Sequence, residues 1–337
     1  MSRKIPLFLV AAAILSAAAL SQSPPAGRTF VTLGPHEHIV SEESCLLASG
    51  GCLADDFFVV TREDVGGKTV YYTYDKSGRK GPFDKITENM LRSCAGNVEP
   101  RKFYRDEEAS MEGLNMAPDS AKPENQYVEF QGQRIGPFQQ VYAMVAAPDK
   151  SRAFAAGVRD KKLHFASTDG RDVVAVGMPD KIVLTGDAGK AVLLCKGTLT
   201  MYPGLDLKPE SMDLSHADDT TLFTLDGKKF GPFAEAAAFG DVWALAHSPD
   251  WLFTVGPTAY FNGAPLKTFA EPISKSRFWI DDASHYGWLQ EEKLMFSDGA
   301  SFPNPVMLQW EKKGGRTTIC WISILPNRNV VGYSRTL

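Results

Sequence analysis

Three segments of the chain share one pattern of residues. Each has an aromatic residue, a turn that contains glycine, a basic residue and then the triplet Gly-Pro-Phe. The triplets are Gly81-Pro82-Phe83, Gly136-Pro137-Phe138 and Gly231-Pro232-Phe233. Glycine, and to a lesser degree Asp and Asn, adopts the positive φ that tight hairpin turns require. The pattern therefore predicts a series of antiparallel hairpins.

The hairpin signal recurs along most of the chain. Turn glycines of this kind stand at positions 78, 132, 170, 204, 227, 263 and 299. Several neighbours in this series are 34 to 38 residues apart, a spacing typical of a four-stranded unit repeated in series. These hairpins account for six units. Strands near the two termini (29–33 and 38–41 with 316–324 and 329–336) would complete a further one. We therefore expect an all-β fold, a β-propeller of seven four-stranded antiparallel blades, with six as the alternative.

The position of proline within this pattern indicates which strand carries it. Proline cannot donate a hydrogen bond to a sheet and is confined to edge strands. The outermost strand of a propeller blade is such an edge. We expect the three Gly-Pro-Phe triplets to be structural, with each phenylalanine packed between neighbouring blades.

The repeats resemble those of bacterial β-propeller families. The turns at Ala147-Pro148-Asp149 and Ser248-Pro249-Asp250 are similar to the turns that link strands in TolB-type and WD-repeat propellers. The hairpins that end in Gly-Pro-Phe resemble repeats of secreted bacterial proteins. The Gly-His and Trp-Asp signature of true WD repeats does not recur. The resemblance implies one propeller domain over residues 28–337.

The N-terminus has the pattern of a secretory signal. Arg3 and Lys4 precede a run of 16 uncharged, mostly apolar residues (5–20), which is short for a membrane span. We expect a signal peptide over residues 1–21, a flexible leader over 22–27, and a mature chain that is periplasmic or secreted and not integral to the membrane. The net charge of −4 argues against a nucleic-acid partner.

A charged stretch at about 97–126 separates the first two hairpins. It contains a weak helical pattern over 106–116, which Gly113 interrupts. We expect this stretch to be an insertion without regular structure.

Five cysteines fit an exported protein. Cys45, Cys52 and Cys94 are candidates for a disulfide, and Cys45–Cys52 and Cys52–Cys94 are both open pairings. Cys195 and Cys320 lie in apolar runs and are expected to be buried thiols.

Candidate site residues are few. Asp281 and Asp282, with His285, follow a predicted inner strand and could form a metal site for Ca²⁺ at the channel mouth. Trp243, Trp279 and Trp321 are expected in equivalent strands of the core. Trp251 and Trp288 follow turns and are candidates for an exposed aromatic patch that binds a partner, with His247 and His285 on the same rim; the alternative, which we favour, is that both tryptophans fill the core.

Two functions follow from these features. The first is an exported, non-catalytic binding or scaffold protein of the bacterial envelope, without a cofactor. It would be a monomer that binds a protein or an envelope polymer through a loop rim. The alternative is a metal-dependent hydrolase or lyase with its site at the central channel. No nucleophile elbow, phosphate-binding loop or zinc-binding helix motif is present in the sequence.

Overall fold

The computed structural model describes residues 27–48, 51–54, 57–87, 103–105, 110–186, 190–197, 219–234, 237–246, 248–303 and 305–337. The predicted signal peptide and all of the leader but Gly27 lie outside these residues. The predicted turn at Gly204 and the disulfide candidate Cys94 also lie outside these residues. The described residues contain no helix that is long and apolar enough to cross a membrane.

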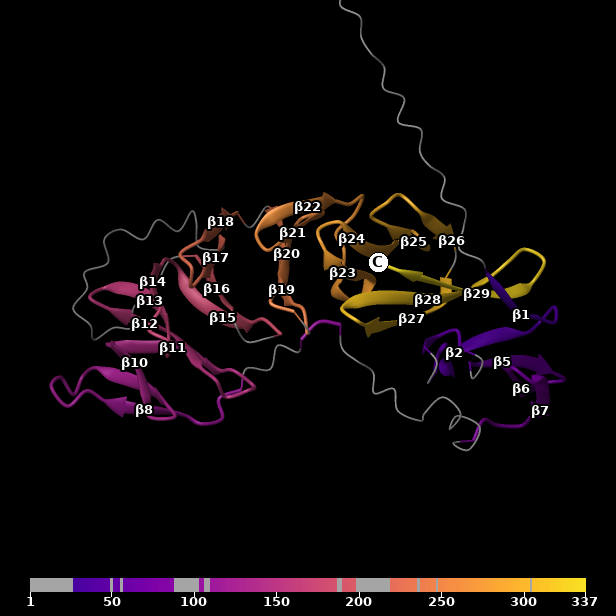
Figure 1. Ribbon diagram of the computed structural model, residues 1–337, viewed down its shortest axis with the longest axis horizontal. Coiled ribbons are helices and arrows are strands. Elements are labelled where there is room, and N and C mark those ends of the chain that lie inside the picture. Colours follow the sequence, from indigo (N-terminus) through magenta and orange to yellow (C-terminus); the bar gives the residue numbers. More distant parts are fainter. Residues whose placement is uncertain are drawn as a thin grey trace, which may run out of the picture.

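The described strands form seven antiparallel sheets of three or four strands, the blades, and one two-stranded hairpin. Figure 1 shows the blades arranged one after another. Blade 1 consists of β2 (His38–Cys45), β5 (Phe58–Val65), β6 (Lys68–Asp75) and β7 (Gly78–Phe83). Blade 2 consists of β8 (Leu114–Pro118), β9 (Gln126–Phe130) and β10 (Gln133–Phe138). Blade 3 consists of β11 (Gln140–Ala146), β12 (Ala153–Arg159), β13 (Lys162–Ser167) and β14 (Asp172–Ala175).

The other blades have four strands each. Blade 4 consists of β15 (Met178–Leu184), β16 (Ala191–Lys196), β17 (Thr220–Thr224) and β18 (Lys229–Phe233). Blade 5 consists of β19 (Phe239–Ala244), β20 (Trp251–Val255), β21 (Thr258–Phe261) and β22 (Ala264–Thr268). A short 3₁₀ turn, η3 (Lys275–Arg277), precedes blade 6, which consists of β23 (Phe278–Asp282), β24 (His285–Gln290), β25 (Lys293–Phe296) and β26 (Ser301–Pro303).

Blade 7 combines strands from the two ends of the chain. Its strands are β27 (Pro305–Lys313), β28 (Arg316–Ile324), β29 (Asn329–Thr336) and, outermost, β1 (Arg28–Thr32). β1 pairs antiparallel with β29, with Arg28 opposite Gly332. The N-terminal strand thus covers the edge of the C-terminal sheet, which would otherwise be open to pairing with another chain. The fold is a β-propeller with seven blades, as expected, and the six-bladed alternative is wrong.

The hairpin turns form at the glycines that the sequence indicates. Gly78, Gly132, Gly170, Gly227, Gly263 and Gly299 all have positive φ. Several of these turns are preceded by an aspartate that accepts a hydrogen bond from the backbone two residues later. In blade 1, for example, Ser77 donates its N–H to Asp75 at 2.7 Å. The repeat of turn residues therefore sets the repeat of blades.

The Gly-Pro-Phe triplets lie in the outermost strands β7, β10 and β18, where a missing N–H is tolerated. Phe138 is fully buried and lies over Gly157 of blade 3, where an added Cβ would come within 2.8 Å of the ring. Phe233 lies 5.6 Å from Phe253 of blade 5, measured between ring centroids. These two phenylalanines therefore pack between blades. Phe83 is half-buried.

Blade 2 differs from the others because three strands are described in it instead of four. The expected insertion at 97–126 is too long, because residues 114–118 form β8 and pair with β9. The weak helical pattern over 106–116 forms no helix in its described residues from 110 on, which form a bridge, a turn and the start of that strand. Gly113, at positive φ, belongs to the turn that precedes β8.

A short segment between blades 1 and 2 contacts the inner strands of later blades. Phe103 and Tyr104 pack near blades 5, 6 and 7: Tyr104 bridges Leu245, and the Phe103 ring lies 5.0 Å from that of Trp310. The Tyr104 hydroxyl donates to the carbonyl of Phe278 at 3.0 Å. This segment therefore fills space beside three inner strands that a propeller channel would otherwise leave open.

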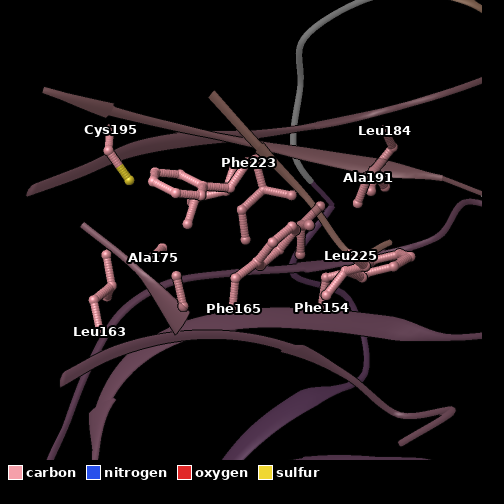
Figure 2. Packing of buried hydrophobic residues seen from close by; sticks show 13 residues of the cluster. Phe154, Leu163, Phe165, Ala175, Leu184, Ala191, Cys195, Phe223 and Leu225 are labelled. Carbon is pink, nitrogen blue, oxygen red and sulfur yellow. The ribbon is translucent and has the colours of Figure 1, made fainter. Parts of the chain in front are cut away.

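The core lies between blades. Figure 2 shows one such layer, in which Phe154, Leu163 and Phe165 of blade 3 face Leu184, Ala191, Cys195 and Phe223 around blade 4. Cys195 is buried, and burial raises the pKa of its thiol to about 12. It is therefore an inert core residue at neutral pH.

Strand direction assigns the loops to two sides of the ring. Because successive strands are antiparallel, the turns from first to second strand and from third to fourth strand of a blade lie on the same side. We call this side the loop face. In blades 3 to 7 it carries turns that include Asp149, Arg171, Lys190, Lys228 and His285.

Candidate functional site

The acidic pair chosen from the sequence lies at the loop face of blade 6. Asp282 is the last residue of β23, and its Oδ1 lies 2.7 Å from Nδ1 of His285, the first residue of β24. The backbone N–H of Ser284 also donates to Asp282, at 2.9 Å. Burial alone would raise the pKa of Asp282, but hydrogen bonds from Ser284 and His285 outweigh it and the pKa is lowered. Both side chains are about half exposed.

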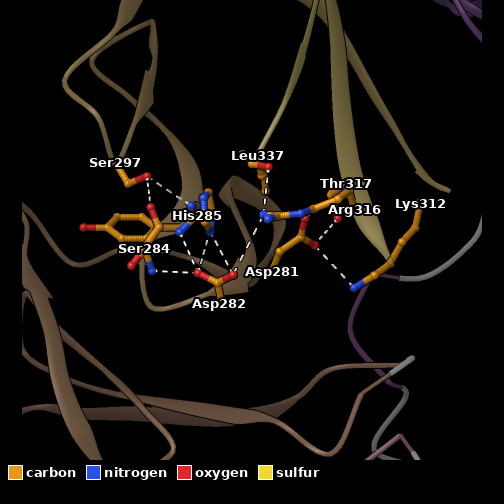
Figure 3. A network of polar contacts seen from close by, with 10 residues as sticks. Asp281, Asp282, Ser284, His285, Ser297, Lys312, Arg316, Thr317 and Leu337 are labelled. Atoms are coloured by element: carbon orange, nitrogen blue, oxygen red, sulfur yellow. Dashed lines mark hydrogen bonds and ion pairs between the residues drawn. The ribbon is translucent and has the colours of Figure 1, made fainter. Parts of the chain in front are cut away.

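Asp281 points away from this pair and into the boundary with blade 7, as Figure 3 shows. Its carboxylate accepts hydrogen bonds from the N–H of Thr317 at 2.6 Å and from the Thr317 hydroxyl at 2.5 Å. The Nζ of Lys312 lies 3.3 Å from its Oδ1, and the side chain of Asp281 is only 4% exposed. This carboxylate therefore links β23 to β27 and β28.

The predicted metal site is consequently wrong in its geometry. Adjacent residues of a strand point to opposite faces, so Asp281 and Asp282 do not converge. No group of three or more metal-ligating side chains is found in the part of the chain that the structure describes. Asp281 is structural, and Asp282 orients His285 in an exposed turn.

The two aspartates give a matched pair of substitutions. We expect Asp281→Ala to lower the free energy of unfolding by about 2–4 kcal/mol, because it leaves Thr317 and Lys312 without their partner in a buried place. Asp282→Ala should change it by less than about 1 kcal/mol, as for other exposed ion pairs. Urea unfolding of both variants measures the difference. Equal losses would contradict the structural role of Asp281.

The candidate aromatic patch is also wrong. Trp251 is 3% exposed and Trp288 is 4% exposed. They lie in β20 and β24, the second strands of their blades, whose two faces are covered by neighbouring blades. Trp321 lies in the corresponding strand β28, so it groups with these two rather than with Trp243 and Trp279 of the inner strands. His247 lies outside the described residues.

The first of the two candidate disulfides is not formed. Cys45 and Cys52 are both thiols, and both are half-buried. The Cys45 thiol donates to the carbonyl of Leu47 at 2.7 Å. The alternative partner, Cys94, cannot be placed among the described residues. Cys320 is a buried thiol as expected.

A pocket that the sequence did not indicate lies on the loop face where blades 3, 4 and 5 meet. Its volume is about 280 Å³. Its cationic lining residues are Arg171 from the β13–β14 turn, Lys190 before β16 and Lys228 from the β17–β18 turn. Phe230 and Trp251 line the apolar side. We call it the cationic pocket.

Ion pairs neutralise part of the charge in the cationic pocket. Arg171 donates two hydrogen bonds to Asp169 Oδ2, from Nε at 3.0 Å and from Nη2 at 2.6 Å, and these contacts hold the pKa of Asp169 far below its usual range. Lys228 lies 3.0 Å from Asp226, whose pKa is lowered by the Thr224 hydroxyl first and also by Lys228.

Lys190 is exposed, and its ammonium group has no ion-pair partner within the described ranges. Among the described residues, the pocket therefore has two cations in ion pairs and one, Lys190, outside them.

The polar lining of the cationic pocket also includes Thr224 and Asn262, which add a hydroxyl and an amide. Such an arrangement holds an anionic group against an apolar wall. A sequence signal for two of its cations did exist, because Arg171 and Lys228 are the basic residues that directly follow the turn glycines.

Comparisons with known proteins add the following. No family model matches the sequence, and no curated protein sequence matches it. Among solved structures, the chain is similar to the β-propeller domain of the Trilobed protease from Pyrococcus furiosus, which has an open velcro topology. The identity is 9% and the TM-score 0.26, over 91% of this chain and 96% of that one.

A second similar structure is puromycin hydrolase, at 12% identity and a TM-score of 0.26. That match covers 90% of this chain, which spans about half (54%) of the hydrolase. The propeller architecture of this chain follows from its own strand order.

Proposed function

We propose that this protein is a non-catalytic binding protein of the bacterial envelope, exported to the periplasm or secreted, and that it works as a monomer. Within this proposal it belongs with the secreted propeller repeat proteins that have TolB-type or WD-like turns. Its partner is a protein or an envelope polymer that carries carboxylates. The observation that carries the proposal is the cationic pocket on the loop face.

The pocket supports a carboxylate-bearing partner through charge and shape. Arg171, Lys190 and Lys228 attract an anionic group, and only Lys190 has no carboxylate partner among the described residues. The half-buried Phe230 provides an apolar surface against which the ring face of a sugar or an aliphatic chain can pack. Binding that depends on such partly exposed charges weakens as salt is added.

Charge reversal tests this proposal. We expect Lys190→Glu combined with Lys228→Glu to weaken binding to purified peptidoglycan sacculi by at least about tenfold, which corresponds to about 1.4 kcal/mol. The matched control is Lys68→Glu with Lys162→Glu, two exposed lysines in turns on the opposite side of the ring. Binding is measured by depletion of protein from solution, at low and at high salt.

Chitin, a neutral glycan, is the matched ligand without carboxylates. Equal weakening by both double variants, or equal binding of wild-type protein to chitin and to sacculi, would contradict the proposal. If sacculi are not bound, the same two variants can be compared for capture of a protein partner by chemical cross-linking. Loss in the pocket variant alone would then identify a protein as the partner.

A further inference from the structure

A small hairpin of blade 1 reaches across to blade 7. It consists of β3 (Leu47–Ala48) and β4 (Gly51–Cys52), which pair with each other between β2 and β5. The N–H of Leu46 donates to the side chain of Gln309 at 2.8 Å. The N–H of Cys52 donates to the side chain of Glu311 at 3.0 Å. Two side chains of β27 thus fix the hairpin at both of its ends.

This docking brings the Cys52 thiol to Cys320. The Sγ of Cys52 lies 3.9 Å from the carbonyl oxygen of Thr318, two residues before Cys320 on β28. The Sγ of Cys320 lies 3.6 Å from the carbonyl oxygen of Gln309. Both cysteines belong to the same apolar cluster.

A hydrogen bond between the two thiols, followed by burial, raises the pKa of Cys320 well above its usual range. Cys45 also packs on this cluster, and its own thiol donates to the carbonyl of Leu47. Cys52 is therefore the cysteine in direct contact with Cys320.

We propose that Cys52 and Cys320 form a disulfide that fastens blade 1 to blade 7. The oxidant is a disulfide, either a small molecule such as oxidised glutathione or an oxidised protein thiol. The half-buried Cys52 attacks it as a thiolate, which forms a mixed disulfide and releases one thiol. The Cys320 sulfur then attacks the Cys52 sulfur while its proton passes to the departing thiolate, which leaves as the second thiol. Two protein thiols are oxidised and one disulfide is reduced.

The position of this bond explains what it would do. It crosses the boundary at which the ring closes, and it joins residues 268 positions apart (320 minus 52). A cross-link between such distant residues restricts the unfolded chain strongly. In blade 7, the N-terminal strand β1 is held to β29 by hydrogen bonds. The disulfide would add a covalent link between blade 1 and blade 7.

The test uses the full protein, treated with oxidised glutathione and digested with trypsin without reduction. We expect a linked pair of peptides, 29–62 and 317–328. Because 29–62 contains both Cys45 and Cys52, the Cys45→Ser variant assigns the bond: the linked pair should persist in it. Cys195, which is buried in another layer, serves as an internal control and should remain a thiol.

A second measurement follows the effect on stability. The oxidised wild type should melt about 5 °C above the reduced protein, and Cys320→Ser should show no such difference under the same treatment. The proposal would be overturned if Cys52 and Cys320 both remained thiols after oxidation. It would also be overturned if the only disulfide found were the one between Cys45 and Cys52 within peptide 29–62. The peptide result is obtained on wild-type protein and does not depend on whether Cys320→Ser folds.

Discussion

Replacing Trp288 by alanine is expected to lower the free energy of unfolding by about 3–5 kcal/mol, the range for a buried tryptophan. The indole is 4% exposed and lies between Phe269, with ring centroids 5.5 Å apart, and Tyr286, with centroids 5.8 Å apart. The ammonium of Lys267 lies over its ring at 4.7 Å. Alanine removes all of these contacts and leaves a cavity between blades 5 and 6.

Chemical denaturation with a fluorescence or circular dichroism signal measures this loss. Val174→Ala is the control, since Val174 is 53% exposed and its substitution should change the free energy of unfolding by no more than about 0.5 kcal/mol. The loss of unfolding free energy for Trp288→Phe should lie between those of Trp288→Ala and Val174→Ala. A Trp288→Ala variant that keeps wild-type stability but loses partner binding would contradict the buried, structural role of this residue.

Replacing Glu37 by alanine should also lower the free energy of unfolding by about 3–5 kcal/mol, because it leaves several buried hydrogen-bond partners unsatisfied. The carboxylate is 1% exposed and accepts hydrogen bonds from the Thr61 hydroxyl, the Tyr74 hydroxyl and the N–H of Gly34. Arg79 Nε lies 3.7 Å away. One side chain before β2 thus contacts all three other strands of blade 1.

The same contacts predict how stability changes with pH. Burial would raise the pKa of Glu37, but the hydrogen bonds and Arg79 outweigh it, so the pKa in the folded state lies below its usual value. The stability that this carboxylate contributes is therefore complete above pH of about 4.3, its usual pKa. It is lost as the pH falls through the lowered pKa of the folded state.

Unfolding measured from pH 7 down to pH 3 tests the sign. Glu37→Gln should be less stable than wild type at pH 7, and the difference should shrink as the pH falls. His36→Ala, at an exposed neighbouring position, is the control and should behave as wild type at pH 7. A difference between Glu37→Gln and wild type that grows toward acid would contradict the lowered pKa.

The repeat architecture could be predicted from the sequence because its determinants are local. Turn glycines at positive φ and prolines at strand edges depend on a few neighbouring residues, and they indicated the hairpins and the seven blades. The contribution of the N-terminus to the last blade also followed, because a sheet edge needs a cover.

The site could not be predicted in the same way. Whether Trp251 is exposed depends on the neighbouring blade, which no local pattern describes. Asp281 and Asp282 are adjacent in sequence but face different partners, and the partner of Asp281 is 36 residues away. The cationic pocket combines turns of three blades, and the contact of Cys52 with Cys320 joins the two ends of the chain.

The place of β1 has a consequence for the order of events during synthesis. Thr32 and Asn329 are hydrogen-bonded although they are 297 positions apart. A ribosome must therefore synthesise the chain as far as β29 before the first strand finds its neighbour. Until then, six blades can fold in succession while the seventh lacks its outer strand, and a nascent chain that stops before β29 leaves β1 without a partner. Synthesis of β29 therefore sets the moment at which blade 7 can be completed.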